Sequence, residues 1–92
     1  MKKTKEVSIW KIGKNYLVRT VTMTTTGKLK AVTEQELLFS DAAWIADTGR
    51  FSVSLKDSDN FSEVEPFVND VIVGRNSIID ATEIIKLPRE MK

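Results

Sequence analysis

The chain of 92 residues contains no cysteine and no histidine. The absence of cysteine excludes a disulfide framework, a thiolate metal site and a thiol nucleophile. The absence of histidine removes the usual general base near neutral pH and the commonest ligand of zinc and iron. Enzymatic chemistry is therefore restricted to carboxylates, lysine and tyrosine. We expect a protein that is not an enzyme and that uses no cofactor and no metal.

The sequence also has little net charge and no long apolar run. Its 14 basic and 13 acidic residues are mixed, so no overall electrostatic field attracts nucleic acid. The chain opens with the basic stretch MKKTK, and Glu6 and the strand-like VSIW follow, which differs from a secretory signal. The apolar stretches are too short to span a bilayer. We expect one domain over residues 1–92, in the cytoplasm and not in a membrane.

Helix-favouring stretches are scarce, because β-branched residues dominate and apolar residues recur with a period of two. This pattern predicts strands over residues 7–12, 16–26, 27–32 and 36–46, with turns at 13–15 and 33–35. Beyond residue 50 we expect one helical turn or a short strand over 51–56 and a polar loop over 57–60. An extended segment over 63–67 follows, and then a pair of strands, 71–73 and 78–79, with an extension over 82–87.

Alternation also predicts which residues are buried. The expected core consists of Leu29, Ala31, Leu37, Phe39 and Ala43. Within the strand predicted over residues 16–26, alternation assigns the residues to two opposite faces. One face carries Leu17, Val21 and Met23, and the other carries Tyr16, Val18, Thr20 and Thr22. Arg19 interrupts the first of these faces. The threonines of residues 20–26 are expected on a solvent-facing surface.

Five or six short, closely connected strands without a long helix predict a mainly β fold. The leading architecture is a small SH3-like or Sm-like barrel, and a barrel of the oligonucleotide-binding type is the alternative. Such a barrel removes exposed strand edges by closing on itself or on a neighbouring copy. We therefore expect a homo-oligomer.

Two segments are similar to the Sm motifs. Residues 18–39 resemble the first motif, in which an apolar strand, a glycine, an alternating strand, a short turn and an apolar strand follow one another. The stretch VIVGRNSIIDATEI resembles the second, although its arginine–glycine pair is reversed as Gly74-Arg75. The turn that carries an aspartate and an asparagine for RNA binding in that family holds Thr33-Glu34-Gln35-Glu36 here. The resemblance implies a fold and a ring, but its RNA site does not transfer.

The whole chain also resembles a family of small uncharacterised proteins encoded by phages. The similarity covers Arg19-Thr20, the G-x-L strand at residues 27–29, the stretch DAAWIADTGRF at 41–51 and DATEI at 80–84. It implies a phage context, and thus the cytoplasm of a host cell. Small phage proteins without catalytic groups often act as inhibitors, and some sequester nucleotide signals of host immunity.

The least expected residues crowd into one segment: Trp44, Asp47, Thr48, Gly49 and Arg50. A tryptophan can stack a base, an arginine can bind phosphate, a glycine lets backbone donors approach an anion, and a threonine adds a neutral donor. These are the parts of a nucleotide pocket. In the alternative interpretation Trp44 belongs to the core, residues 47–49 form a capped turn, and Arg50 pairs with a carboxylate.

Arg19 within a strand and Arg75 in a glycine-containing turn are further candidate ligand-binding residues. Each either forms a structural ion pair, with Asp80, Glu63 or Glu65 as a partner, or binds a ligand phosphate or a neighbouring subunit. Carboxylates with no fixed geometry are expected to be solvated instead of catalytic or metal-binding: Glu34, Glu36, Asp41, Glu63, Glu65 and Asp80.

The sequence thus predicts a non-catalytic binding protein. The leading hypothesis is a phage counter-defence protein that sequesters a nucleotide-like signalling molecule. One alternative is an Sm-like oligomer that binds RNA. The other is a protein-interaction module that inhibits a host enzyme.

Overall fold

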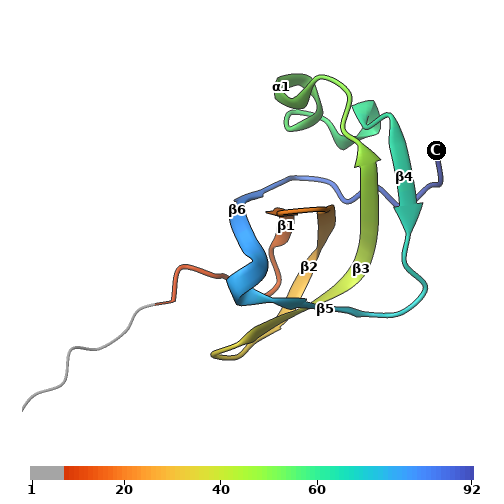
Figure 1. Cartoon of the computed structure of the whole chain (residues 1–92). Coiled ribbons are helices and arrows are strands. Elements are labelled where there is room, and N and C mark those ends of the chain that lie inside the picture. Colours follow the sequence, from red (N-terminus) through yellow and green to blue (C-terminus); the bar gives the residue numbers. More distant parts are fainter. Residues whose placement is uncertain (1–7) are drawn as a thin grey trace, which may run out of the picture.

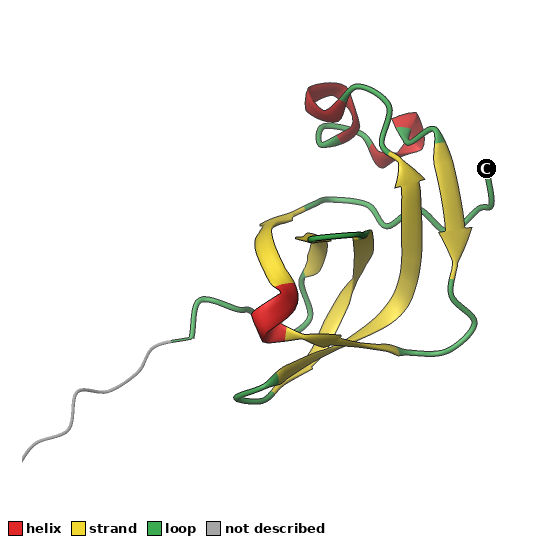
Figure 2. Cartoon of the chain, in the orientation of Figure 1, coloured by secondary structure: helices red, strands yellow, loops and turns green. Residues whose placement is uncertain are grey.

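The structure is a computed structural model and describes residues 8–92. Six antiparallel strands dominate it (Figure 2), which confirms the prediction of a mainly β protein. The strands are β1 (Asn15–Thr20), β2 (Thr24–Val32), β3 (Glu36–Asp47), β4 (Glu63–Pro66), β5 (Val71–Gly74) and β6 (Ile78–Glu83). Three short helical segments connect them: α1 (Phe51–Ser54) and the 3₁₀ turns η1 (Ser58–Asn60) and η2 (Arg75–Ser77).

All six strands belong to one sheet with the order β4-β3-β2-β1-β6, and β5 also pairs with β3. The 12-residue strand β3 pairs with two strands along the same edge: its first part pairs with β5 and its second part with β4. Asp41 separates the two parts with a φ of 49°, a left-handed conformation that aspartate tolerates better than most residues. Figure 1 shows β5 at the lower part of the long β3, with which it pairs, and the chain then continues through η2 into β6.

The prediction of one continuous strand over residues 16–26 was wrong, because the chain reverses between β1 and β2. The turn contains neither glycine nor proline, and Thr20 provides its hydrogen bonds. The Thr20 N–H donates to the Met23 carbonyl at 2.8 Å, and the Thr20 Oγ1 accepts from the Met23 N–H at 3.1 Å. Gly27, expected to begin a strand, therefore lies inside β2.

Two other predicted strand assignments also differ. Ser8 to Ile12 form no strand, and Val7 lies outside the described residues. This segment is held by side chains instead: the Trp10 and Tyr16 rings pack edge to face, and the Lys11 N–H donates to the Tyr16 hydroxyl. The strands over 71–73 and 78–79 do not pair with each other, because β5 pairs with β3 and β6 with β1.

The apolar residues form two clusters, and the predicted separation of two faces is confirmed within β1, because Leu17 belongs to one cluster and Tyr16 and Val18 belong to the other. Leu17 and Val18 are adjacent and both fully buried. Thr25 and Thr26 are buried as well, contrary to the expected solvent-facing surface. The first cluster consists of Tyr16, Val18, Leu29, Leu37, Phe39, Ala42 and Val73. The second consists of Leu17, Ala43, Ile45, Phe61, Val64 and Ile84, beside α1. Of the expected core residues, Leu29, Leu37, Phe39 and Ala43 are fully buried, and Ala31 is partly buried.

Candidate functional site

Residues 47–49 form a closed turn at the end of β3. The Gly49 N–H donates to the Asp47 Oδ1 at 2.8 Å, and Gly49 has a φ of +69°, which favours glycine. The Thr48 hydroxyl donates to the Gly49 carbonyl, and the Ser54 hydroxyl donates to the Thr48 carbonyl. The polar groups of this segment therefore bond to one another and to Ser54, the last residue of α1.

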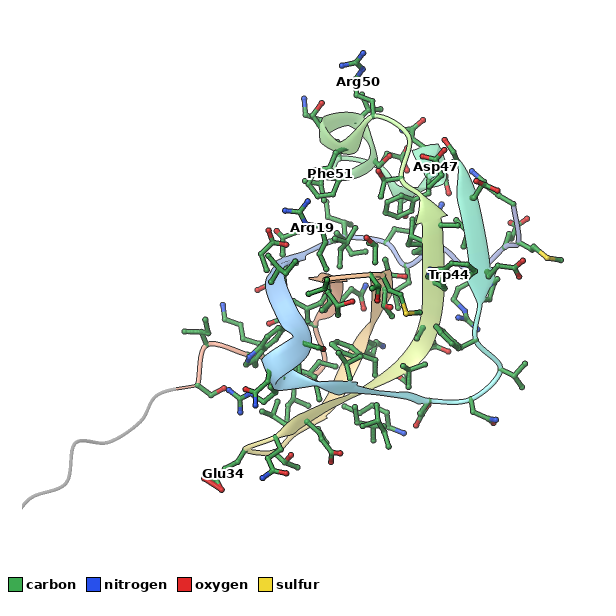
Figure 3. The ribbon with its side chains drawn as sticks, viewed as in Figure 1. Arg19, Glu34, Trp44, Asp47, Arg50 and Phe51 are labelled. Atoms are coloured by element: carbon green, nitrogen blue, oxygen red, sulfur yellow. The ribbon has the colours of Figure 1, made fainter. Side chains whose placement is uncertain are left out.

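Arg50 precedes α1, and its carbonyl accepts hydrogen bonds from the Val53 and Ser54 N–H groups. None of the ion pairs among residues 8–92 includes Arg50. Figure 3 shows Arg50 at the outer end of the α1 region, whereas Trp44 lies along β3. The structure does not bring Arg50 together with Trp44.

Trp44 instead lines a pocket beside the turn that joins β1 to β2. Its neighbours Ala43 and Ile45 are buried, while the Trp44 side chain is 39% exposed. The pocket has a volume of about 380 Å³ and is open to solvent. Its lining consists of Arg19, the turn and strand residues 20–24, Trp44, Ile45, Ala46 and Ile79.

The strand register explains how Arg19 and Trp44 reach one pocket. Arg19 pairs with Thr24, and Thr24 pairs with Ile45, the residue that follows Trp44. The two residues thus belong to neighbouring rows across β1, β2 and β3. Side chains of neighbouring rows project to opposite faces of a sheet, so Arg19 and Trp44 approach the pocket from different sides.

Arg19 forms an ion pair with Asp80 on β6, one of the three partners that the sequence suggested. The Arg19 Nε donates to the Asp80 Oδ1 at 2.8 Å, and the Arg19 Nη2 donates to the Asp80 Oδ2. These hydrogen bonds and the guanidinium charge lower the pKa of the Asp80 carboxyl, and the same hydrogen bonds and the carboxylate charge raise the pKa of Arg19. The Arg19 Cζ also lies 5.2 Å from the centroid of the Phe51 ring, a cation–π geometry (Figure 3).

Arg75 lies elsewhere, where it ties η2 to the turn between β2 and β3. Its Nη1 donates to the Thr33 carbonyl at 2.6 Å, and its backbone N–H donates to the Gln35 carbonyl at 2.9 Å. These contacts give Arg75 a structural role in joining two distant segments. Glu34 lies at the tip of the same turn (Figure 3).

The carboxylates do not gather into a metal-binding arrangement. Within residues 8–92 no group of three or more aspartate, glutamate, histidine or cysteine residues is placed to hold a metal ion. Asp80 is engaged by Arg19, and Glu65 on β4 lies opposite Trp44 in the β3–β4 register.

Sequence reasoning missed three exposed apolar residues that line the pocket: Val21, Met23 and Ile79. Their side chains are 80%, 43% and 63% exposed. The predicted strand over residues 16–26 includes Val21 and Met23, and its alternation gives no indication that their side chains are exposed. The one available sign was the presence of large apolar residues among threonines in a stretch that supplies no core residue.

No protein-family model, no curated protein and no solved structure matches this chain. None of the helices in residues 8–92 has the length and hydrophobicity needed to span a bilayer. The function is therefore proposed from the residues and their geometry.

Proposed function

We propose that this chain is a non-catalytic binding protein that holds a nucleotide-like ligand in the pocket lined by Arg19 and Trp44. The observation that carries the proposal is the presence of a partly exposed indole in an open pocket of about 380 Å³. This volume lies within the range of about 300–1,000 Å³ that is typical of small-molecule sites. An exposed tryptophan is a stacking platform for a base.

The finer architecture that we propose is an SH3-like or Sm-like barrel, in preference to the oligonucleotide-binding type. The pairing of β5 with β3 and of β6 with β1 supports it. Since η2 joins β5 directly to β6, the chain itself links the two outer strands of the series β5-β3-β2-β1-β6. β5 and β6 are thus connected through η2, and they do not pair with each other.

A homo-oligomer remains part of the proposal. The outer edge of β4 is occupied, because Val64 and Lys92 exchange backbone hydrogen bonds of 3.1 and 3.0 Å. In the described part of the chain no second strand pairs with β5 or β6. Uncovered edges of this kind favour association with another copy. We further propose that this oligomer acts in the cytoplasm of a host cell, where it sequesters a nucleotide signal in counter-defence, as the resemblance to phage proteins suggests.

A second candidate function is the inhibition of a host protein by docking on the same surface. The exposed apolar side chains of Val21, Met23 and Ile79 favour it, because they surround Trp44 and Arg19. Tryptophan, methionine and arginine are enriched in protein interfaces, and tryptophan and arginine dominate their binding energy.

Calorimetric titration with a panel of mononucleotides, cyclic dinucleotides and a short RNA tests the proposal. We expect wild-type protein to bind a nucleotide stoichiometrically, and Trp44→Ala to lose about 1–3 kcal/mol, roughly 5- to 150-fold in affinity. Trp44→Phe, which keeps an aromatic face, is expected to retain most of the binding. Arg50→Ala is the matched control, because Arg50 does not line the pocket.

Different outcomes separate the candidates. RNA binding by an Sm-like ring would strengthen with strand length and fall steeply with salt. Loss of affinity in Arg50→Ala but not in Trp44→Ala would contradict the assignment of the pocket. Absence of binding to every nucleotide and to RNA would contradict the nucleotide and RNA proposals and would favour a protein partner.

A further inference from the structure

One of the two hydrogen-bonding edges of the Arg19 guanidinium is already engaged. Its Nε and Nη2 both donate to the carboxylate of Asp80, which is the two-pronged geometry that arginine also uses for phosphate. Phe51 lies against one face of the same group, 5.2 Å from the Arg19 Cζ. A phosphate on this Nε–Nη2 edge would have to displace the Asp80 carboxylate, and a phosphate on the remaining Nη1 edge would lie close to that carboxylate.

The charge around the pocket leads to the same conclusion. Among residues 8–92, Arg19 is the only charged residue in the pocket lining, and the other nine are uncharged. Asp80 neutralises that charge without lining the pocket itself. A phosphate held at Arg19 would lie close to the Asp80 carboxylate, and the two negative charges would repel each other.

We infer that the pocket accepts an uncharged planar group, such as a nucleobase, and that Asp80 is the specificity residue that keeps phosphate away from Arg19. This inference rests on the proposed function and narrows its ligand class. The base of a nucleotide-like ligand stacks on Trp44, and its phosphates stay in solvent. Binding is consequently insensitive to salt, because no phosphate contact is screened.

The first test compares ribonucleosides with their 5′-monophosphates by calorimetry. We expect wild-type affinities for the two forms to agree within about threefold, because the phosphate makes no charge-assisted contact. Asp80→Asn keeps the size of the side chain but releases the guanidinium. We expect this variant to bind the monophosphate roughly tenfold or more tightly than it binds the nucleoside.

Asp59→Asn is the matched control. It makes the same chemical change at the carboxylate that pairs with Lys86, and neither residue lines the pocket. We expect the ratio of the two affinities in Asp59→Asn to equal that of the wild type. A wild-type preference for the monophosphate of tenfold or more would overturn the inference while leaving the proposed function in place.

A second measurement decides the role of Asp80 even if no nucleoside binds. Inorganic phosphate is titrated while the Arg19 side-chain Nε–H resonance is followed by nuclear magnetic resonance. We expect no shift in wild-type protein and a saturable shift in Asp80→Asn. A phosphate-dependent shift in wild type, or none in Asp80→Asn, would overturn the role of Asp80, whereas absence of all nucleoside and nucleotide binding would overturn the proposed function.

Discussion

Replacement of Gly27 by alanine should destabilise the protein through one atomic contact. A methyl group at Gly27 would lie 2.7 Å from the Phe39 Cβ and 3.2 Å from its Cγ and Cδ1. Phe39 is fully buried in the first cluster. Because the backbone fixes the position of a Cβ atom, no rotation of the Phe39 ring relieves the closest contact. The strands β2 and β3 must therefore move apart.

Overpacking of this kind costs about 1–3 kcal/mol. In a domain of this size each kcal/mol lowers the midpoint of thermal unfolding by roughly 4–8 °C. Gly74→Ala is the matched control, because a Cβ there meets no atom within 4 Å and the residue has φ −69° and ψ 127°. We expect Gly74→Ala to be neutral or to stabilise by about 0.4–1 kcal/mol.

Urea unfolding of both variants and of the wild type measures the difference. Equal stability of Gly27→Ala and Gly74→Ala would refute the close approach of β2 to Phe39. The background variant Phe39→Leu sharpens the test, because leucine keeps the Cβ atom. The cost of Gly27→Ala should persist in that background, and its disappearance would assign the clash to the ring instead.

Two further predictions concern acid stability and the second cluster. Hydrogen bonds from Arg19 lower the pKa of Asp80 below its ordinary value of 3.8, so this ion pair stabilises the fold above about pH 4 and ceases to do so as the pH falls through the lowered pKa. Wild type should therefore lose more free energy of unfolding than Asp80→Asn in this pH window. An equal loss in the denaturation curves of the two proteins would contradict this prediction. Phe61→Ala should cost about 3–5 kcal/mol, because Phe61 is fully buried beside Leu17 and Val64; a cost below about 1 kcal/mol in urea unfolding, typical of an exposed site, would show that the second cluster adds little.

The sequence predicted the local structure correctly where the residues that form a turn or strand lie close together along the chain. The turn at 33–35 is confirmed, because Thr33 accepts and donates across it with Glu36. The continuation of one strand through Ser40 and Asp41 is confirmed as well, since β3 spans Glu36–Asp47. Of the expected core residues on both sides of this turn, Leu29, Leu37 and Phe39 are fully buried in the first cluster, as alternation predicts, and Ala31 is partly buried.

Alternation gave the two faces of β1 but did not indicate that the protein buries both of them. Leu17 contacts the second cluster and Val18 the first, so two adjacent residues are buried. The elements that cover the second face come from beyond residue 50, and their packing against β1 is not encoded in the period of β1 itself. The turn after Thr20 was missed for a related reason, since a threonine hydroxyl replaces the usual glycine or proline there.

The sequence grouped Trp44 with Arg50 because the two residues are close along the chain, but the structure does not bring them into one pocket. Trp44 and Arg50 are separated by the closed turn of residues 47–49, whereas Arg19 reaches the Trp44 pocket through strand pairing. The pairing of Arg19 with Asp80 was among the alternatives, because a cation within a β pattern calls for a partner.

The turn that the sequence concealed is also the feature that argues most strongly for binding. Both apolar clusters are built without Val21, Met23 or Ile79, so folding does not require these side chains to be apolar. Single exposed apolar residues are ordinary on protein surfaces, but here they come from two separate segments and meet Trp44 at one pocket. A polar turn would satisfy the same Thr20 hydrogen bonds, since these involve only the backbone of Met23. Under the proposed function, contact with a ligand or partner would account for the apolar side chains at this pocket, for which the two apolar clusters give no reason.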